Sequence, residues 1–214
     1  AYAHNNVKIV GTAPGVTHTY NGGTHMCFQD LAIMRAMPNM HVYSPCDAYE
    51  LRAVMKYMAA EKQPTYLQLI RDKMAPIFGE DASFDPLKAK VLREGTDVTI
   101  VTTGFSTQLA YKALALCDEK KISAELIHYP SVKPFDADTL VASARKTGFV
   151  VAVENQSVIG GLGSAVCEVL SERHPVKVKR LGAQDRFGEV GSLDYLCELI
   201  GISPKQIAEA CAAK

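Results

Sequence analysis

Two histidines in a glycine-rich segment near the start of the chain are the first candidates for chemistry. We call residues 15–25 the histidine segment; it contains His18 and His25, which are seven residues apart. Imidazoles supply proton transfer and phosphate contacts near neutral pH, and glycines let the backbone approach a ligand closely. We therefore expect this segment to form one wall of an active site.

Other interpretations of these residues stay open. A histidine in a polar loop can be solvated and idle, although two in one glycine-rich loop favour a role. No third metal ligand with suitable spacing is obvious nearby, so acid–base chemistry or binding of phosphate and hydroxyl groups fits better. Arg71 is a third candidate, because an arginine after a strand can clamp phosphate or carboxylate through two hydrogen bonds. It could equally be an ordinary surface arginine.

The elements that would position these residues follow an α/β order. We expect strands at residues 7–11, 40–44 and 65–70, alternating with helices at 29–37 and 48–62. The strand at 7–11 is expected to be buried, and Asp47 with Glu50 forms a capping box for the second helix. Ligands bind at the carboxyl ends of strands in open α/β sheets. The histidine segment and Arg71 are therefore expected at one sheet edge.

A second α/β unit follows an interruption rich in proline, glycine and acidic residues. We expect a first domain at 1–75, a linker at 76–86 and a second domain at 87–214. The second domain has expected strands at 89–92, 98–102, 124–128, 149–153 and 176–181, and expected helix caps at Ser106, Asp136 and Ser203. The glycines of residues 160–163 favour close helix–sheet packing over a dinucleotide site. Glu154 and Gln156, expected in the connecting loop, could cap the helix that follows or face a partner chain.

Composition narrows the class of protein. The chain has 214 residues, 48% hydrophobic and 21% charged, with a formal net charge of zero, which makes nucleic acid an unexpected partner. Apolar runs are too short to cross a membrane, and the first residues do not resemble a secretory signal. The six cysteines have no Cys-x-x-Cys spacing, so we expect reduced core cysteines, no metal site and a cytoplasmic location.

Several ordered motifs resemble the C-terminal half of transketolase, most closely the C-terminal subunit of split transketolases. In the first domain these are residues 7–11, the Gly23-Thr24-His25 step, and residues 34–40 and 44–48. In the second domain they are residues 102–104, 130–136, 153–155, 159–165 and 185–189. The resemblance implies the second half of a parallel-sheet pyrimidine-binding domain followed by an α/β transketolase C-terminal domain. 1-Deoxyxylulose-5-phosphate synthase and the β subunits of 2-oxo-acid dehydrogenases are the nearest competitors.

The resemblance also implies a reaction and roles for individual residues. The family uses thiamine diphosphate and magnesium to move a two-carbon ketol unit between sugar phosphates in carbohydrate metabolism, as in the pentose phosphate pathway. It implies that His25 is catalytic and lies beside the cofactor, and that His18, Asn21 and Arg71 bind substrate. Gly23 stands where the family has proline, and Asn21 stands where it has aspartate, which puts the usual aldose preference in doubt.

Parts of the family site are expected outside these residues. The diphosphate and magnesium motif and the glutamate that activates the cofactor belong to sequence that we expect upstream or in a partner. We therefore expect a piece that is inactive alone, that needs an N-terminal transketolase subunit or domain, and that forms homo-oligomers. The alternative is a non-catalytic docking or regulatory remnant.

Overall fold

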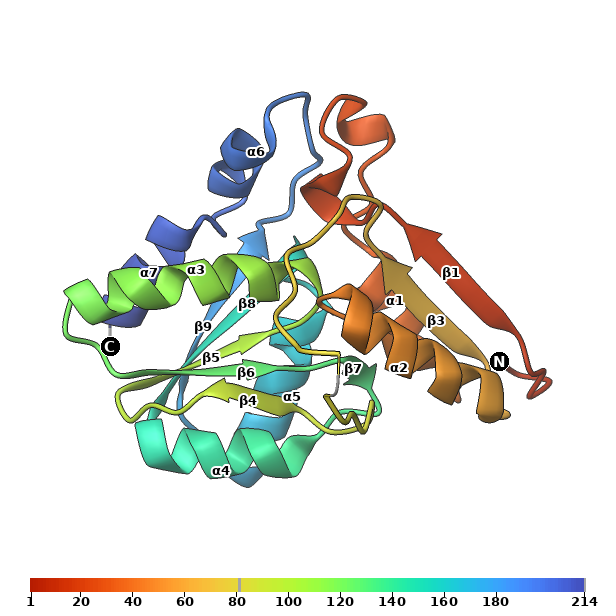
Figure 1. Ribbon diagram of the computed structural model, residues 1–214, viewed down its shortest axis with the longest axis horizontal. Helices are drawn as coiled ribbons and strands as arrows, with labels where there is room; N and C mark the ends of the chain where they lie inside the picture. Colours follow the sequence, from red (N-terminus) through yellow and green to blue (C-terminus); the bar gives the residue numbers. More distant parts are fainter. Residues whose placement is uncertain (81, 214) are drawn as a thin grey trace.

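The computed structural model describes residues 1–80 and 82–213, and two β-sheets lie side by side in it (Figure 1). The strands are β1 (Lys8–Thr12), β2 (His41–Tyr43), β3 (Thr65–Leu69), β4 (Lys90–Arg93), β5 (Val98–Thr102), β6 (Ala124–His128), β7 (Ser131–Lys133), β8 (Phe149–Ser157) and β9 (Lys177–Ala183). The helices are α1 (Asp30–Ala36), α2 (Ala48–Ala60), α3 (Phe105–Glu119), α4 (Ala137–Thr147), α5 (Leu162–Arg173), α6 (Leu193–Leu199) and α7 (Pro204–Ala212), with short 3₁₀ turns η1 (Gly15–Thr17) and η2 (Gly22–Thr24).

The first sheet has the strand order β1-β3-β2-β7. Strands β1 and β2 both run parallel to β3, whereas β7 pairs antiparallel with β2. Because β7 comes from the second half of the chain, both halves contribute to this sheet. The sequence did not predict β7, because three residues between Pro130 and Pro134 carry no recognisable strand pattern.

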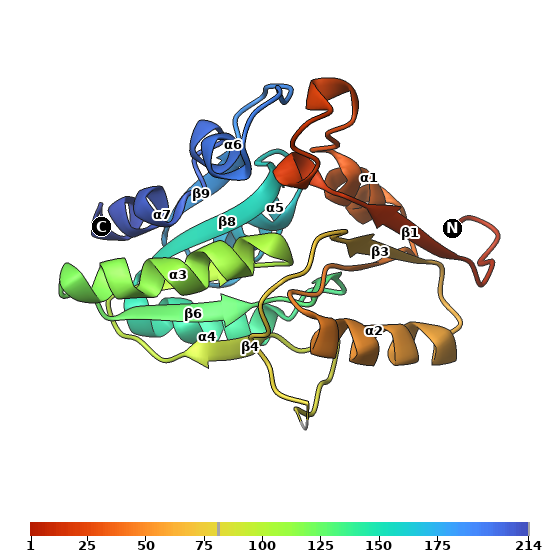
Figure 2. The ribbon, with the colours of Figure 1, turned by 45° about the horizontal axis from the view of Figure 1, so that its top comes forward.

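The second sheet has the order β4-β6-β5-β8-β9. Its strands are parallel except for β4, which pairs antiparallel with β6. Helices α3 and α7 cover one face and α4 and α5 the other (Figures 1 and 2). Strands β5 and β6 are wholly buried, as central strands of a sheet covered on both faces should be. The expected α/β class with parallel sheets is confirmed.

Strand β1 corrects the expectation of a buried strand at residues 7–11. It lies at the edge of the first sheet, and Ile9 and Val10, on opposite faces, are 39% and 50% exposed. β-Branched residues indicate a strand, but they do not show whether that strand is central or at an edge, because its neighbours decide its burial.

The expected helix starts are partly right. Ser203 forms the full predicted capping box with Gln206 at the start of α7, and Asp136 caps α4. Ser106 is not an N-cap: Gly104 takes that position in α3, and the Ser106 hydroxyl donates to the carbonyls of Thr103 and Val153. A serine in the first turn of a helix can thus be mistaken for a cap when its hydroxyl bonds to carbonyls, here that of the nearby Thr103 and that of Val153 on β8.

The capping box expected at α2 is only half formed. Asp47 accepts the Glu50 N–H at 2.9 Å as predicted. The Glu50 carboxylate does not return to Asp47; its Oε2 accepts the Cys46 N–H at 2.8 Å and lies 2.7 Å from Nε2 of His128. The second half of the box is lost because this carboxylate reaches β6 of the other sheet.

Glu154 of β8 caps α5, as the sequence suggested. Its two carboxylate oxygens accept the N–H groups of Leu162 at 2.8 Å and Gly163 at 2.9 Å, and its side chain is fully buried. Burial raises the pKa of Glu154 to about 7, although the two N–H donors and the charges of Arg180 and Arg35 act in the opposite direction. The carboxylate therefore titrates near neutral pH while holding a helix end.

This titration predicts a pH-dependent stability. A carboxyl whose pKa is higher in the folded than in the unfolded chain favours folding when protonated, and this contribution is lost as pH rises from about 4.5 to about 7. Glu154→Gln cannot ionise, so the stability of the wild type relative to it should fall by at most about 3 kcal/mol between about pH 5 and about pH 8. Urea unfolding of both proteins across this range measures the difference; parallel pH profiles would contradict the assignment.

Candidate active site

The histidine segment follows β1 at the carboxyl end of the first sheet and lies beside the loop that follows β9 (Figures 1 and 2). The Thr19 carbonyl accepts the Gly191 N–H at 3.3 Å. A Cβ on Gly23 would collide with the Gly188 carbonyl, so the two loops touch through bare backbone. Residues 185–189 thus form part of the support of this segment.

Asn155 of β8 fixes the start of the segment. Its Oδ1 accepts the Val16 N–H at 3.1 Å, and its Nδ2 donates to the Pro14 carbonyl at 3.0 Å. Gly15, between these two residues, has a φ of +55°, and a Cβ there would collide with Asn155. The glycine is therefore needed both for the backbone conformation and for the close approach of the amide.

The two candidate histidines are brought together. Their ring centroids lie 6.0 Å apart, with the rings nearly perpendicular at 84°. The Thr24 hydroxyl lies 2.8 Å from Nδ1 of His25. When this hydroxyl donates to Nδ1, the ring proton is on Nε2, which can exchange it with a ligand because His25 is exposed. His18 is partly buried beside it.

Arg71 joins this group through a shared pocket. The pocket has a volume of about 310 Å³, and its lining includes His18, Arg71, Tyr20 and Asp72. Asn21 is exposed at the N-cap of η2 and is not among the lining residues. His18 thus links the other two candidates on one surface: its ring lies 6.0 Å from that of His25, and it lines a pocket with Arg71, whereas neither His25 nor Asn21 lines that pocket. Their roles in binding or catalysis stay predictions.

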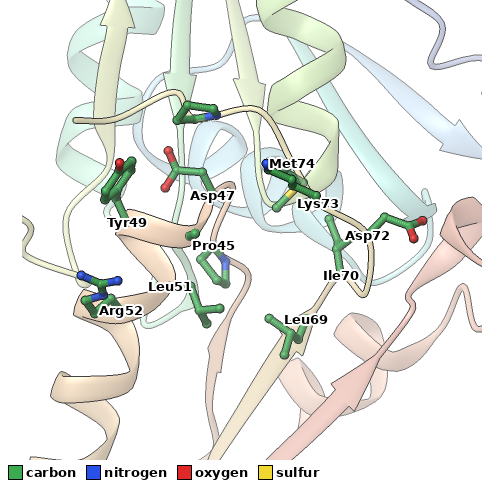
Figure 3. Close-up of a pocket in the computed structure, with 12 residues that line it drawn as sticks. Pro45, Asp47, Tyr49, Leu51, Arg52, Leu69, Ile70, Asp72, Lys73 and Met74 are labelled. Atoms are coloured by element: carbon green, nitrogen blue, oxygen red, sulfur yellow. The ribbon is translucent and has the colours of Figure 1, made fainter. Parts of the chain in front are cut away.

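A larger pocket, of about 380 Å³, is lined in part by Ile70, Asp72 and Lys73, which flank Arg71 in the sequence (Figure 3). Asp72 lines both pockets. The walls of the larger pocket include Pro45, Arg52 and Lys73, but no histidine. We place the candidate active site at the smaller pocket, because His18 lines it and His25, the other group able to transfer protons, lies beside His18.

A buried group of three reactive side chains, which the sequence did not predict, lies apart from the histidine segment. Cys46, Glu50 and His128 are all buried, and one ligand atom of each lies within 4.8 Å of those of the other two. In the described part of the chain, this is the one group of three or more such side chains close enough for a metal ion. Nothing in the sequence links Glu50 to His128, since they are 78 residues apart.

The cysteines are free thiols, and most of them are buried. In the described residues all six are free; Cys46, Cys117, Cys197 and Cys211 are buried, and Cys27 is exposed.

None of the helices within 1–80 and 82–213 is long and apolar enough to cross a membrane.

Two family models match the chain. The transketolase pyrimidine-binding domain matches residues 1–76, and the transketolase C-terminal domain matches residues 87–207. Together they include the histidine segment, Arg71 and the supporting loop after β9.

Individual proteins give the same result. The 6-deoxy-6-sulfo-D-fructose transketolase subunit of Clostridium sp. (strain MSTE9) is 47% identical over 98% of this chain and 65% of its own length. A putative transketolase C-terminal section of Methanocaldococcus jannaschii is 39% identical over 98% of this chain and 66% of its own length. The chain thus spans just under two thirds of the length of these relatives.

A solved structure is also similar over the whole chain. It is described as a split-gene transketolase in an inactive β4 tetramer, and it has 41% identity and a TM-score of 0.92. The match covers 100% of this chain and 68% of that one.

The hold of Asn155 on the histidine segment can be tested directly. Asn155→Ala leaves the buried Val16 N–H without its acceptor, which should lower the free energy of unfolding by about 1–3 kcal/mol. The Val16 amide should also exchange its hydrogen faster in native conditions. Urea unfolding and amide exchange measure these effects. Asn5→Ala, at an exposed asparagine, is the matched control, and equal behaviour of the two variants would contradict the role of Asn155.

Proposed function

Because the chain belongs to the transketolase family, we propose that it is the C-terminal part of a thiamine diphosphate-dependent enzyme that transfers a two-carbon ketol unit between sugar phosphates or similar sugar anions. One observation carries this proposal: His25, His18 and Arg71 lie along one surface at the carboxyl end of the first sheet. Family membership supports the reaction class, and this surface supports the placement of a substrate.

The surface suits an extended sugar with a charged end. We propose that Arg71 binds the anionic group, since a guanidinium forms paired hydrogen bonds with phosphate oxygens. His18, which lines the same pocket, and the neutral amide of Asn21 would bind hydroxyl groups. His25 would then lie at the reacting end. A sulfonate is also an acceptor for Arg71, and the Clostridium relative, described as a 6-deoxy-6-sulfo-D-fructose transketolase subunit, supports testing sulfonated sugars.

The residues present fit one wall of a cofactor site. When bound, thiamine diphosphate supplies an electron sink that stabilises a carbanion. His25 would hold a proton at Nε2 and exchange it with a substrate hydroxyl or with the cofactor's amine. Among the described residues, no group of three metal-binding side chains lies at the histidine segment. We therefore propose that magnesium and the diphosphate are held mainly by another subunit or domain.

A site divided in this way between two chains or domains requires a partner. We propose an N-terminal transketolase subunit, self-association of this chain, and no activity of the chain alone. The relatives described as transketolase subunits support the first, and the neighbour described as an inactive β4 tetramer supports the other two by analogy. We keep residues 1–75 and 87–214 as the proposed domains and 76–86 as the proposed linker.

Reconstitution tests the proposal. The chain is mixed with the N-terminal subunit of a split transketolase, thiamine diphosphate and magnesium, and ketol transfer is measured with phosphorylated and sulfonated ketose donors. Transfer only in the mixture supports the proposal. Formation of 1-deoxyxylulose 5-phosphate and carbon dioxide in a parallel assay with pyruvate and glyceraldehyde 3-phosphate would support a synthase instead. A complex that forms and binds cofactor but transfers nothing would favour a docking or regulatory role.

His25→Ala in the reconstituted enzyme should lower turnover by about two to four orders of magnitude, the usual contribution of a positioned acid–base group. Thiamine diphosphate binding by the complex is measured in parallel, so that loss of assembly is separated from loss of chemistry. His174→Gln, at a histidine outside the surface, is the control. Unchanged turnover in His25→Ala would remove this residue from the mechanism.

Arg71→Ala should change KM, whereas His25→Ala should change turnover. Loss of a charge-assisted contact to the anionic end should raise KM about tenfold or more for phosphorylated substrates, corresponding to about 1.5–3 kcal/mol. The effect should be small for the same sugar without its phosphate. Steady-state kinetics with both substrates measure the difference, and Arg52→Ala, in the other pocket, is the matched control. An equal rise in KM for the sugar with and without its phosphate would show that the anionic group binds elsewhere.

A further inference from the structure

The buried group of Cys46, Glu50 and His128 lies outside the candidate active site and joins the two sheets. Cys46 is in the connection from β2 to α2, Glu50 is in the first turn of α2, and His128 ends β6. All three are fully buried, and one ligand atom from each lies within 4.8 Å of the other two. Three different ligand types therefore converge where the first sheet's helix meets the second sheet.

Hydrogen-bond directions determine which histidine nitrogen is free. The Thr102 hydroxyl donates its proton to the Ile127 carbonyl at 3.2 Å, so its oxygen accepts from Thr107 at 3.0 Å. The single hydroxyl proton of Thr107 is thereby used. Its oxygen can then only accept from Nδ1 of His128, which lies 2.8 Å away. The ring proton of a neutral His128 is therefore on Nδ1.

The other nitrogen then faces an acceptor. Nε2 of His128 lies 2.7 Å from Oε2 of Glu50, and two lone-pair-bearing atoms this close need a positive charge between or beside them. The second oxygen of this carboxylate, Oε1, is buried and has no hydrogen-bond partner among the described residues. A buried carboxylate with an unpaired oxygen is costly unless it is neutralised or coordinates a metal.

The surroundings add negative charge and a third ligand. Asp47, next to Cys46, is also buried, and its carboxylate is held by the N–H groups of Glu50, Ile77 and Phe78. In the described structure, His128 is the one basic side chain within 4 Å of the Glu50 carboxylate, and it carries a positive charge only when both ring nitrogens are protonated. A divalent cation would compensate these carboxylates and accept the sulfur as a ligand.

We propose that Cys46, Glu50 and His128 form a binding site for a zinc ion. Sulfur, imidazole nitrogen and carboxylate oxygen are all ordinary zinc ligands, whereas magnesium and calcium prefer oxygen alone. On binding, the Cys46 S–H bond breaks, its proton goes to solvent, and a zinc–sulfur bond forms; the lone pair of His128 Nε2 and one oxygen of Glu50 complete the protein ligands. Thr107, on Nδ1, is the outer partner that orients the imidazole.

The position of this site suggests a structural role and a route of access. Pro45 and Asp47, on either side of Cys46, line the larger pocket (Figure 3), so an ion entering that pocket meets the wall behind which the ligands lie. Once bound, it would join α2 to β6. The sequence alone led us to expect no metal site, because the ligands come from residues that are far apart in the chain.

The first test uses the wild-type chain without a metal-binding tag. Metal analysis after purification with zinc present should find about one zinc per chain, and its removal by a chelator should lower the melting temperature, because a ligand of the native state stabilises it. Cobalt added to the metal-free protein should give a thiolate-to-cobalt charge-transfer band in the near ultraviolet. Absence of bound metal together with a melting temperature unchanged by zinc would overturn the proposal and leave a shared proton between His128 and Glu50.

Matched variants locate the ion. Cys46→Ser should abolish the charge-transfer band, and both it and His128→Gln should weaken zinc binding at least about tenfold. Cys27→Ser, which removes the exposed cysteine, should keep full binding. Circular dichroism checks that each variant folds. If a variant does not fold, the zinc content and melting temperature of the wild-type chain still decide the proposal. Cobalt or zinc binding that Cys46→Ser leaves unchanged, or that Cys27→Ser removes, would overturn the assignment.

Discussion

The buried amide of Asn155 is the interaction on which the geometry of the candidate site depends. It accepts from Val16 of the histidine segment and donates to Pro14 just before it, and it does so from β8, which has a neighbouring strand on each side in the second sheet. A buried amide with both ends hydrogen-bonded fixes position and direction, because moving the segment would leave polar groups unpaired. Glu154, its neighbour, holds α5 in the same way. The end of β8 therefore organises parts of both sheets.

The two halves of the chain are joined by more than this strand. Arg35 of α1 donates to the carbonyls of Gly160 and Gly161 at 2.6 and 3.2 Å and pairs with Glu168 of α5. Lys133 of β7 donates to the carbonyls of Arg35 and Met37. The second half contributes no imidazole or guanidinium to the pocket of His18 and Arg71. Its part in the site is to support the loop from behind.

The sequence predicted what depends on local pattern. Apolar runs and caps indicated most strands and helices and the α/β class, and the spacing of glycine and histidine after a strand indicated the segment at the site. It could not predict that β1 is an edge strand, that β7 joins the first sheet, or that Glu50 reaches His128. Each of these depends on contacts between distant residues. The half-formed capping box shows the physical reason. The Asp47 N–H is available nearby to the Glu50 carboxylate, but in the folded chain this carboxylate lies against His128 of the other sheet instead.

The exposure of the reactive groups sets what this surface can do. His25 and Arg71 face water, where charges are screened and hydrogen bonds exchange with solvent, so their influence on a transition state is weak. Proton transfer and anion binding become effective when an opposing surface excludes that water and fixes the substrate. The segment is held rigidly from behind by Asn155, while its reactive side remains open. A rigid wall of this kind is suited to a site completed by another surface, which is why we place the remaining catalytic groups on a partner.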